Sequence, residues 1–179
     1  MYTFKYYYQH IIKQDLLTKF DYNNALQIPF LNKIVINFGA SQSTFKNLLP
    51  SLASAPLLCS QFPYITISKK TTLLLKTKGG VAIGCKIDLR GINKFFFFEK
   101  FIFCILPRIK NFCYVVVDNN VFFKLDNLFL FKEIAKEYDY FQDLPKLSVN
   151  LNFKAKNSKE VSVFLSALKF PPIIKSQYD

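Results

Sequence analysis

The residue types that perform most enzymatic chemistry are sparse in this chain. The single histidine, His10, falls in a predicted amphipathic helix and has no neighbouring serine, cysteine or carboxylate. A general acid or base needs a reacting group within hydrogen-bond reach. Gly79, Gly80 and Gly84 are too sparse for a nucleotide-binding loop, and no GxxxxGK sequence occurs. We therefore predict no catalytic residue and no enzymatic activity.

The cysteines and carboxylates predict no metal centre and no cofactor. Zinc sites use closely spaced ligand pairs, and this chain contains no CxxC sequence. Its four cysteines all have apolar neighbours, which favours small buried side chains in a reducing compartment; they are Cys59, Cys85, Cys104 and Cys113. One carboxylate cluster is typical of a solvated surface and consists of Glu133, Glu137, Asp139 and Asp143.

The basic residues carry the clearest functional signal. The chain holds 24 Lys and Arg against 12 Asp and Glu, a net charge of +12 at pH 7. Residues 64–110 alone contain ten basic and two acidic residues. A surface that needs only to be soluble mixes both signs. This concentration indicates an anionic partner, either nucleic acid or a membrane surface.

Length and composition predict one domain over residues 1–179. The 51% hydrophobic content excludes a disordered chain. The longest uncharged run, residues 47–68, contains three prolines and several polar residues, so no membrane span is predicted. The first twelve residues lack the continuous apolar stretch of a secretory signal.

Hydrophobic periodicity predicts an α+β fold, a largely antiparallel β-sheet with helices packed on one face. The predicted strands cover residues 33–39, 64–68, 83–90, 113–117, 121–125 and 147–153. The predicted helices cover residues 4–20, 43–59, 91–106 and 157–168. Prolines should kink or end the second helix, the third is apolar enough to be buried, and the last begins at a capping box, Asn157 to Glu160.

A long basic loop joins the second and third strands. Residues 68–84 carry four lysines and no acidic residue. Loops of this length are usually functional or disordered, and lysines on a loop suit contacts with a phosphate backbone. A purely solvated loop is the alternative. The candidate residues are Lys69, Lys70, Lys76 and Lys78, with a Gly79-Gly80 hinge.

Polar residues around the neighbouring strands extend this basic region. Asn37, Lys86 and Arg90 occupy outward strand positions, and Gln61 lies in a loop. Such side chains can bind ribose hydroxyls and phosphates of a folded RNA. No strand carries the aromatic motif of proteins that read single-stranded RNA. We therefore predict RNA binding by shape at these four residues.

Several segments resemble the large-subunit ribosomal protein family conventionally numbered five, which binds 5S ribosomal RNA. The first is Lys33-Ile34-Val35-Ile36-Asn37-Phe38-Gly39, and the second is Ile83-Gly84-Cys85-Lys86-Ile87-Asp88-Leu89-Arg90-Gly91. Leu106-Pro107-Arg108-Ile109 and residues 155–171 also match. The resemblance covers nearly the whole chain, and the combination of the second segment with Leu-Pro-Arg-Ile is specific.

The resemblance implies a structural component of the central protuberance of the large ribosomal subunit. Asn37, Gln61 and Arg90 would then hold 5S rRNA, and the basic loop would approach peptidyl-site tRNA. Residues 108–118 and 133–146 would form a bridge to a protein of the small-subunit head. Neighbouring proteins of the protuberance would be further partners.

Two departures from the family pattern stand out. Asp88 occupies a position that is usually small and neutral or carries a hydroxyl, and Asn119-Asn120-Val121 replaces a Gly-Asn-Tyr turn. The abundance of Phe, Lys and Tyr and the start of the match at Met1 predict a protein made in an organelle, a mitochondrion before a plastid. Three alternatives stay open: an RNA that replaces 5S rRNA, direct binding to large-subunit rRNA, and a basic peripheral membrane or protein-binding module.

Overall fold

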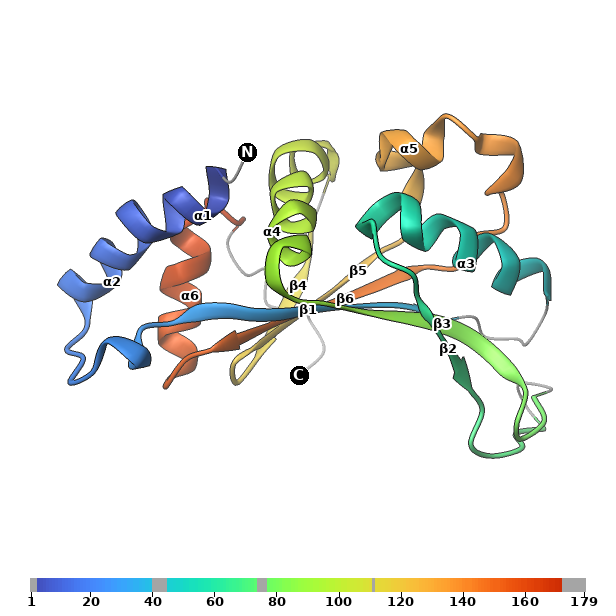
Figure 1. The fold of residues 1–179 in the computed structure, drawn as a ribbon, viewed down its shortest axis with the longest axis horizontal. Coiled ribbons are helices and arrows are strands. Elements are labelled where there is room, and N and C mark those ends of the chain that lie inside the picture. The colour runs from blue at the N-terminus through green and yellow to red at the C-terminus, as the bar shows by residue number, and fades with distance from the viewer. Residues whose placement is uncertain (1–2, 40–44, 74–76, 111, 172–179) are drawn as a thin grey trace. The chain divides into compact units, whose positions relative to one another are not determined.

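The structure is a computed structural model that describes residues 3–39, 45–73, 77–110 and 112–171 (Figure 1). Six strands form one sheet in the order β2-β3-β1-β6-β5-β4. They are β1 (Phe30–Gly39), β2 (Tyr64–Ile67), β3 (Ala82–Leu89), β4 (Tyr114–Val117), β5 (Asn120–Leu125) and β6 (Leu147–Lys154). Strands β2 and β3 pair antiparallel, as do β4 and β5. The predicted α+β class and its antiparallel sheet are confirmed.

Helices and helical turns connect the strands. The α-helices are α1 (Thr3–Tyr7), α2 (Lys13–Lys19), α3 (Phe45–Cys59), α4 (Gly91–Lys100), α5 (Lys132–Ala135) and α6 (Ser158–Ala167). Two π-helical turns are η1 (Tyr8–Ile12) and η3 (Phe101–Ile105). The 3-10 turns are η2 (Ala25–Gln27), η4 (Leu106–Arg108), η5 (Leu128–Leu130) and η6 (Tyr138–Tyr140).

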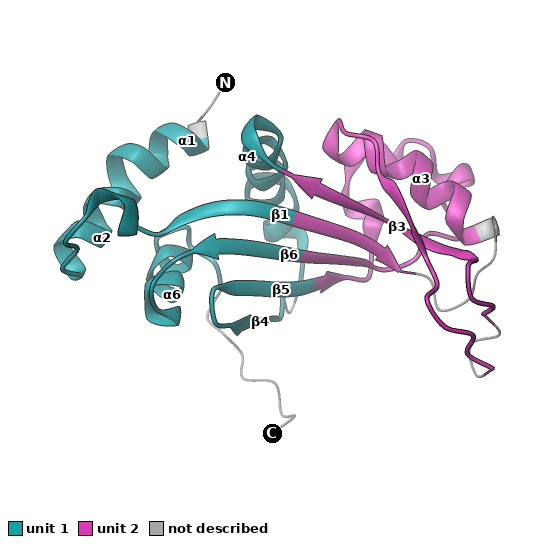
Figure 2. Cartoon of the chain, turned by 60° about the horizontal axis from the view of Figure 1, so that its bottom comes forward, with its two compact units in different colours: residues 1–34, 90–123, 150–179 teal, residues 35–89, 124–149 magenta. Residues whose placement is uncertain are grey.

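The chain divides into two compact units (Figure 2). Unit 1 contains residues 1–34, 90–123 and 150–179, and unit 2 contains residues 35–89 and 124–149. The prediction of one domain over the whole chain stays a prediction.

Unit 1 has an aromatic core. The Phe101 ring stacks on Phe123 with centroids 4.7 Å apart, and Phe112 meets the Phe123 ring edge-on at 5.2 Å. Phe170, just beyond α6, packs on Phe101 at 6.1 Å. Offset and edge-on ring pairs of this kind add about 0.5–1.5 kcal/mol each beyond the burial of their area. The core therefore fixes the segments that follow α4 and α6.

The core of unit 2 lies between β3 and α3. Cys85, Ile87 and Leu89 are buried on alternate positions of β3, and Lys86 and Asp88 between them are partly exposed. Helix α3 packs against this strand. The alternation predicted for β3 is therefore confirmed.

The prolines of α3 were predicted to kink or end the helix, and they do not end it. Pro50 and Pro56 both lie inside the helix, which continues to Cys59. A proline inside a helix costs about 3 kcal/mol through a lost hydrogen bond and a steric clash. The buried face of α3, which packs on β3, offsets that cost.

The other predicted helices form, with two corrections. The residues after Gly91 are not buried all round, because Ile92, Phe96 and Phe103 are exposed and only the opposite face meets the core. The predicted capping box of α6 does not form. The Asn157 side chain makes no capping bond, and Glu160 accepts a hydrogen bond at 3.0 Å from the amide of Lys156, the residue before the N-cap Asn157.

Candidate RNA-binding surface

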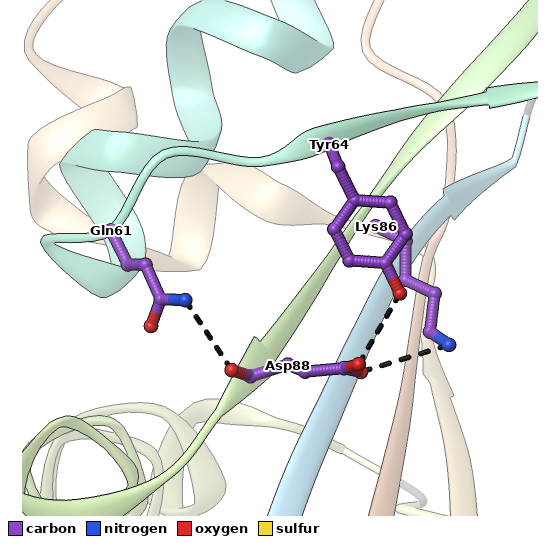
Figure 3. Close-up of polar contacts among 4 residues, drawn as sticks. All are labelled: Gln61, Tyr64, Lys86 and Asp88. Atoms are coloured by element: carbon purple, nitrogen blue, oxygen red, sulfur yellow. Dashed lines mark hydrogen bonds and ion pairs between the residues drawn. The ribbon is translucent and has the colours of Figure 1, made fainter.

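Polar side chains of unit 2 meet around Asp88 on β3. Lys86 and Asp88 share one face of β3, because they are two residues apart in a strand. The neighbouring strand β2 places Tyr64 directly opposite Lys86. Gln61 stands three residues before Tyr64, in the turn between α3 and β2. Strand β3, strand β2 and the turn that precedes β2 thus supply one polar cluster (Figure 3).

The Asp88 carboxylate organises its neighbours through charge. It accepts a hydrogen bond from the Tyr64 hydroxyl at 3.3 Å and lies 3.6 Å from the Lys86 ammonium nitrogen. That nitrogen is also 5.7 Å from the centroid of the Tyr64 ring. The pKa of Lys86 is raised, mainly by a hydrogen bond between the Lys86 and Tyr64 side chains. The charge of Asp88 adds to this rise, and the partial burial of Lys86 opposes it. Lys86 is therefore held in place as a cation.

Gln61 completes the cluster from the other side. Its Nε2 donates to the backbone carbonyl of Asp88 at 3.4 Å, and the side chain is half-buried. This bond fixes the amide and leaves its oxygen to accept a hydrogen bond from a ligand. The structure therefore brings together two predicted residues, Gln61 and Lys86.

The other two predicted strand residues take no part in these bonds. Asn37 is half-buried on β1, the strand that neighbours β3 in the sheet. Arg90 is exposed, follows β3 as the N-cap residue of α4, and belongs to unit 1. Arg90 makes none of the bonds described above for the cluster around Asp88.

Gly84 sets the distance between β3 and β1. A Cβ at this position would lie 2.1 Å from the Phe38 carbonyl oxygen, and real Cβ atoms do not come that close to another atom. Only glycine permits the approach. The position of Lys86 two residues later depends on it.

The long basic loop is a hairpin that folds back on itself. Ser68 and Gly80 are joined by the bond from the Gly80 amide to the Ser68 carbonyl at 2.9 Å. Farther out, Thr72 and Thr77 exchange two backbone bonds of 3.0 and 3.2 Å. Residues Lys69, Lys70 and Lys78 are exposed along these arms, and Lys76 lies outside the described residues.

Gly79 and Gly80 form a tight turn on the returning arm. The Val81 amide donates to the Lys78 carbonyl at 3.4 Å, and Gly80 has a φ of 83°. A type II turn requires a positive φ at its third residue, which glycine provides without strain. The glycine pair that we interpreted as a hinge is thus a hydrogen-bonded turn in the structure.

Polar residues of unit 1 form a second feature, which sequence analysis missed. Asn152 on β6 accepts a hydrogen bond from Asn32 on β1 at 3.1 Å and donates one to Asn120 on β5 at 2.7 Å. The three asparagines make a continuous chain across three strands. The signal was available in part, because Asn152 occupies an outward position in the alternating run of residues 147–153.

The remaining chemical groups of the described residues do not gather into a cluster of metal ligands. No group of three potential ligands among those residues could hold a metal ion. His10 packs on the ring of Tyr6, with centroids 4.2 Å apart. Cys59 and Cys85 are buried as predicted, but Cys104 and Cys113 are exposed because they fall outside the packed faces of their segments. Among the described helices, none is long and apolar enough to cross a membrane.

Comparison with known proteins identifies the family. No protein-family model matches the chain. It is 34% identical over 172 residues to the large ribosomal subunit protein uL5 of Wigglesworthia glossinidia brevipalpis, a match that covers 92% of this chain and 96% of the relative. The chain belongs to the uL5 family. The uL5 protein of Wolbachia pipientis wMel is 33% identical over 175 residues, covering 94% of this chain and 98% of that protein.

A mitochondrial member is among the similar uL5 proteins. The large ribosomal subunit protein uL5m of Reclinomonas americana is 32% identical over 174 residues, covering 93% of this chain and 96% of the relative. The resemblance found in the sequence is thereby confirmed. The uL5 relatives are named as proteins of the large ribosomal subunit, which agrees with the prediction that the chain is not an enzyme.

Proposed function

We propose that this uL5 protein, a structural constituent of the large ribosomal subunit, binds 5S rRNA or its replacement in the central protuberance. The observation that carries the proposal is the charge of residues 64–110, where ten basic residues stand against two acidic ones. One of the two acids, Asp88, is paired with Lys86. A dense RNA backbone is the partner that such an excess suits, because each bound phosphate releases condensed counterions.

The surface around Asp88 would contact the sugar–phosphate backbone. Lys86 would pair with a phosphate, and the Gln61 and Asn37 amides would bond ribose hydroxyls and phosphate oxygens. Arg90 would add a further cation from unit 1. Contacts of this kind position an RNA helix by shape and do not read its sequence.

The hairpin would reach a different RNA. Lys69, Lys70 and Lys78 are exposed, and the described parts of residues 68–81 contain no acidic side chain. We propose that these lysines, together with Lys76 and the Gly79-Gly80 turn, approach the backbone of peptidyl-site tRNA. The backbone bonds within the hairpin support this role, because a stiff arm holds its charges at a set distance from the sheet.

Two segments would form the bridge to a protein of the small-subunit head. Residues 108–118 contain β4, whose Val115 and Val117 are exposed. Of the four carboxylates predicted to be solvated, Glu137, Asp139 and Asp143 in residues 133–146 are exposed, whereas Glu133 is half-buried. Exposed apolar and acidic groups suit a protein partner better than RNA.

We place the protein in the mitochondrial ribosome, with the plastid as the alternative. The similarity to a uL5m protein and the residue usage, with 21 Phe and no Trp, support this location. Sedimentation of the tagged protein with the large subunit of mitochondrial ribosomes is the expected result. Sedimentation with plastid ribosomes would instead support the alternative.

Filter binding to transcribed 5S rRNA tests the main proposal. With roughly six to ten phosphate contacts, the affinity should fall by about 10³–10⁵ between 50 and 200 mM salt. Lys86→Ala should reduce the slope of the logarithmic salt dependence by about 1. A flat salt response, or binding to anionic liposomes in preference to RNA, would contradict the proposal.

A matched pair of triple variants separates the hairpin from the sheet. Replacing Lys69, Lys70 and Lys78 by Ala should change the affinity for 5S rRNA by less than about threefold, because these side chains would contact tRNA. Peptide synthesis by ribosomes that carry this variant should fall. The control replaces Lys19, Lys156 and Lys159, which are exposed in unit 1, and changes the net charge equally. Equal loss of synthesis in both variants would rule out a specific role for the hairpin.

A further inference from the structure

An apolar groove of about 630 Å³ lies within unit 1. Phe4 and Tyr7 of α1 form one wall, and Phe103 and Leu106, on η3 and η4, form another. The residues that follow α6 form the third wall, and Phe112 also lines the groove. Of its described residues, the bridge segment of residues 108–118 contributes Ile109 and Phe112.

Hydrogen bonds and ring packing hold these walls in place. The Tyr7 hydroxyl donates to the Ala167 carbonyl at 3.3 Å, and the Tyr114 hydroxyl donates to the Pro171 carbonyl at 3.0 Å. Phe112 is part of the aromatic core already described. A groove that is formed in advance loses little conformational entropy when a ligand enters.

Phe103 is 69% exposed on the rim of this groove, although the sequence predicted it to be buried. The π-turn η3 contains Phe103, and Pro107 follows four residues later. A proline ring clashes with the carbonyl four residues before it in a regular α-helix, so the wider turn accommodates Pro107. The turn leaves a large aromatic side chain in solvent, where burial by a partner would be favourable.

The lining favours a protein segment over a small molecule or RNA. Sites for small molecules combine apolar walls with a few convergent polar groups. Here the Tyr7 hydroxyl already donates to a carbonyl, and the other described polar side chain on the groove is Lys169. An RNA strand would have to place phosphates against apolar walls. Bulky apolar side chains of a peptide fit this lining directly.

The charge around the groove specifies the flanks of that peptide. Lys169 lines the groove, and Lys110 is exposed and follows the lining residue Ile109 in sequence. None of the described lining residues is acidic. We propose that the groove binds a segment of a neighbouring protein of the large subunit, with large apolar side chains flanked by Asp or Glu. This inference goes beyond RNA binding and does not depend on it.

Two synthetic peptides test the chemistry in solution. Both are 14 residues long with Leu and Phe on one helical face; the opposite face carries Glu in one and Lys in the other. We expect fluorescence anisotropy with the full chain to show at least about fivefold tighter binding of the Glu peptide at 150 mM salt. Equal binding of the two peptides, or tighter binding of the Lys peptide, would overturn the charge assignment.

Variants of the chain locate the peptide. Phe103→Asp should weaken binding of the Glu peptide at least about tenfold, because it puts a carboxylate on the apolar rim. Phe122→Asp, at an exposed aromatic residue of β5, is the matched control and should leave binding unchanged. The double change Lys110→Glu and Lys169→Glu keeps the walls intact and should invert the preference between peptides. If neither the Phe103 change nor the charge reversal alters binding, the groove is not the site.

Photo-crosslinking tests the occupant in the particle. Benzoylphenylalanine replaces Phe103 or, as control, Phe122, in isolated large subunits from which the bridge partner on the small subunit is absent. We expect Phe103 to yield a cross-link to a peptide of another large-subunit protein with Asp or Glu beside apolar residues. A cross-link to RNA, to residues 172–179 of this chain or to a second copy would overturn the proposal, as would a yield no higher than the control. Filter binding to 5S rRNA reports separately on the proposed function.

Discussion

Substitution of Gly84 by Ala gives a direct test of how β3 is positioned. The added Cβ would stand 2.1 Å from the Phe38 carbonyl oxygen and 3.3 Å from the carbonyl carbon. Both are backbone atoms of β1, so no side chain can rotate away to relieve the contact. To reach even 3.0 Å, the closest separation that real Cβ atoms show, the oxygen and the Cβ must move apart by 0.9 Å.

That displacement is large compared with the tolerance of a sheet. A backbone hydrogen bond of about 2.9 Å stretched by this amount no longer qualifies as one. Each buried donor or acceptor left unpaired costs about 1–3 kcal/mol, and overpacking costs a similar amount. We expect Gly84→Ala to lower the free energy of unfolding by about 2–4 kcal/mol, a large part of the about 5–15 kcal/mol of an ordinary domain.

Urea denaturation followed by circular dichroism measures this change. Gly79→Ala is the matched control, because a Cβ there meets nothing closer than Thr71 Oγ1 at 3.6 Å. At such a position Gly→Ala stabilises by about 0.4–1 kcal/mol, through the lower entropy of the unfolded chain. The two variants should therefore shift the midpoint in opposite directions. A Gly84→Ala variant within about 0.5 kcal/mol of the original chain would refute the steric argument.

Three further predictions concern single side chains. Asp88→Asn removes an anion from the proposed RNA-binding surface and frees Lys86, so filter binding should show an affinity for 5S rRNA raised about two- to fivefold, whereas reduced affinity would show that Asp88 is needed to orient the cluster. The Tyr22 hydroxyl is buried without a hydrogen-bond partner among the described residues, and burial followed by the Glu160 charge raises the pKa of Tyr22 to about 12. The folded state therefore keeps a proton that the unfolded state releases above about pH 10, so the free energy of unfolding falls as the pH rises from there towards 12. Tyr22→Phe should make that fall shallower in urea titrations and should raise the free energy of unfolding by about 0.5–1 kcal/mol at pH 7. Glu160→Ala should lower the free energy of unfolding by about 1–2 kcal/mol, because the Lys156 amide loses its acceptor, and Glu160→Gln should lower it by less than half as much.

Local patterns were sufficient to predict most of the sheet. The alternation of Cys85, Ile87 and Leu89 predicted both the strand and its buried face, because side chains of a strand point to opposite faces in turn. The same argument holds for the run from Leu147 to Phe153. Predictions for the helices were wrong where tertiary packing overrides local preference. Pro50 and Pro56 should weaken α3, yet contact with β3 keeps it helical.

The candidate RNA surface was predictable only in part. The basic charge and outward position of Lys86 can be read along one strand, whereas its pairing with Tyr64 depends on the register between β2 and β3. The chain of asparagines from Asn32 to Asn120 depends likewise on strand order, which local periodicity does not specify. The exposure of Phe103 depends on a π-turn that no pattern in the sequence predicted.

Asp88 shows how an acidic residue can be compatible with the proposed RNA-binding surface. An isolated carboxylate there would repel phosphates, but Asp88 is 3.6 Å from the Lys86 ammonium group and accepts a bond from Tyr64. Two opposite charges at that distance attract by about 1 kcal/mol in water, which offsets part of the repulsion and limits the motion of a long, flexible side chain. A lysine held in advance loses less entropy on meeting a phosphate. The aspartate thus lowers the charge of the surface by one unit while it fixes the cation beside it, and the rise in RNA affinity expected for Asp88→Asn means that the first of these two effects is the larger.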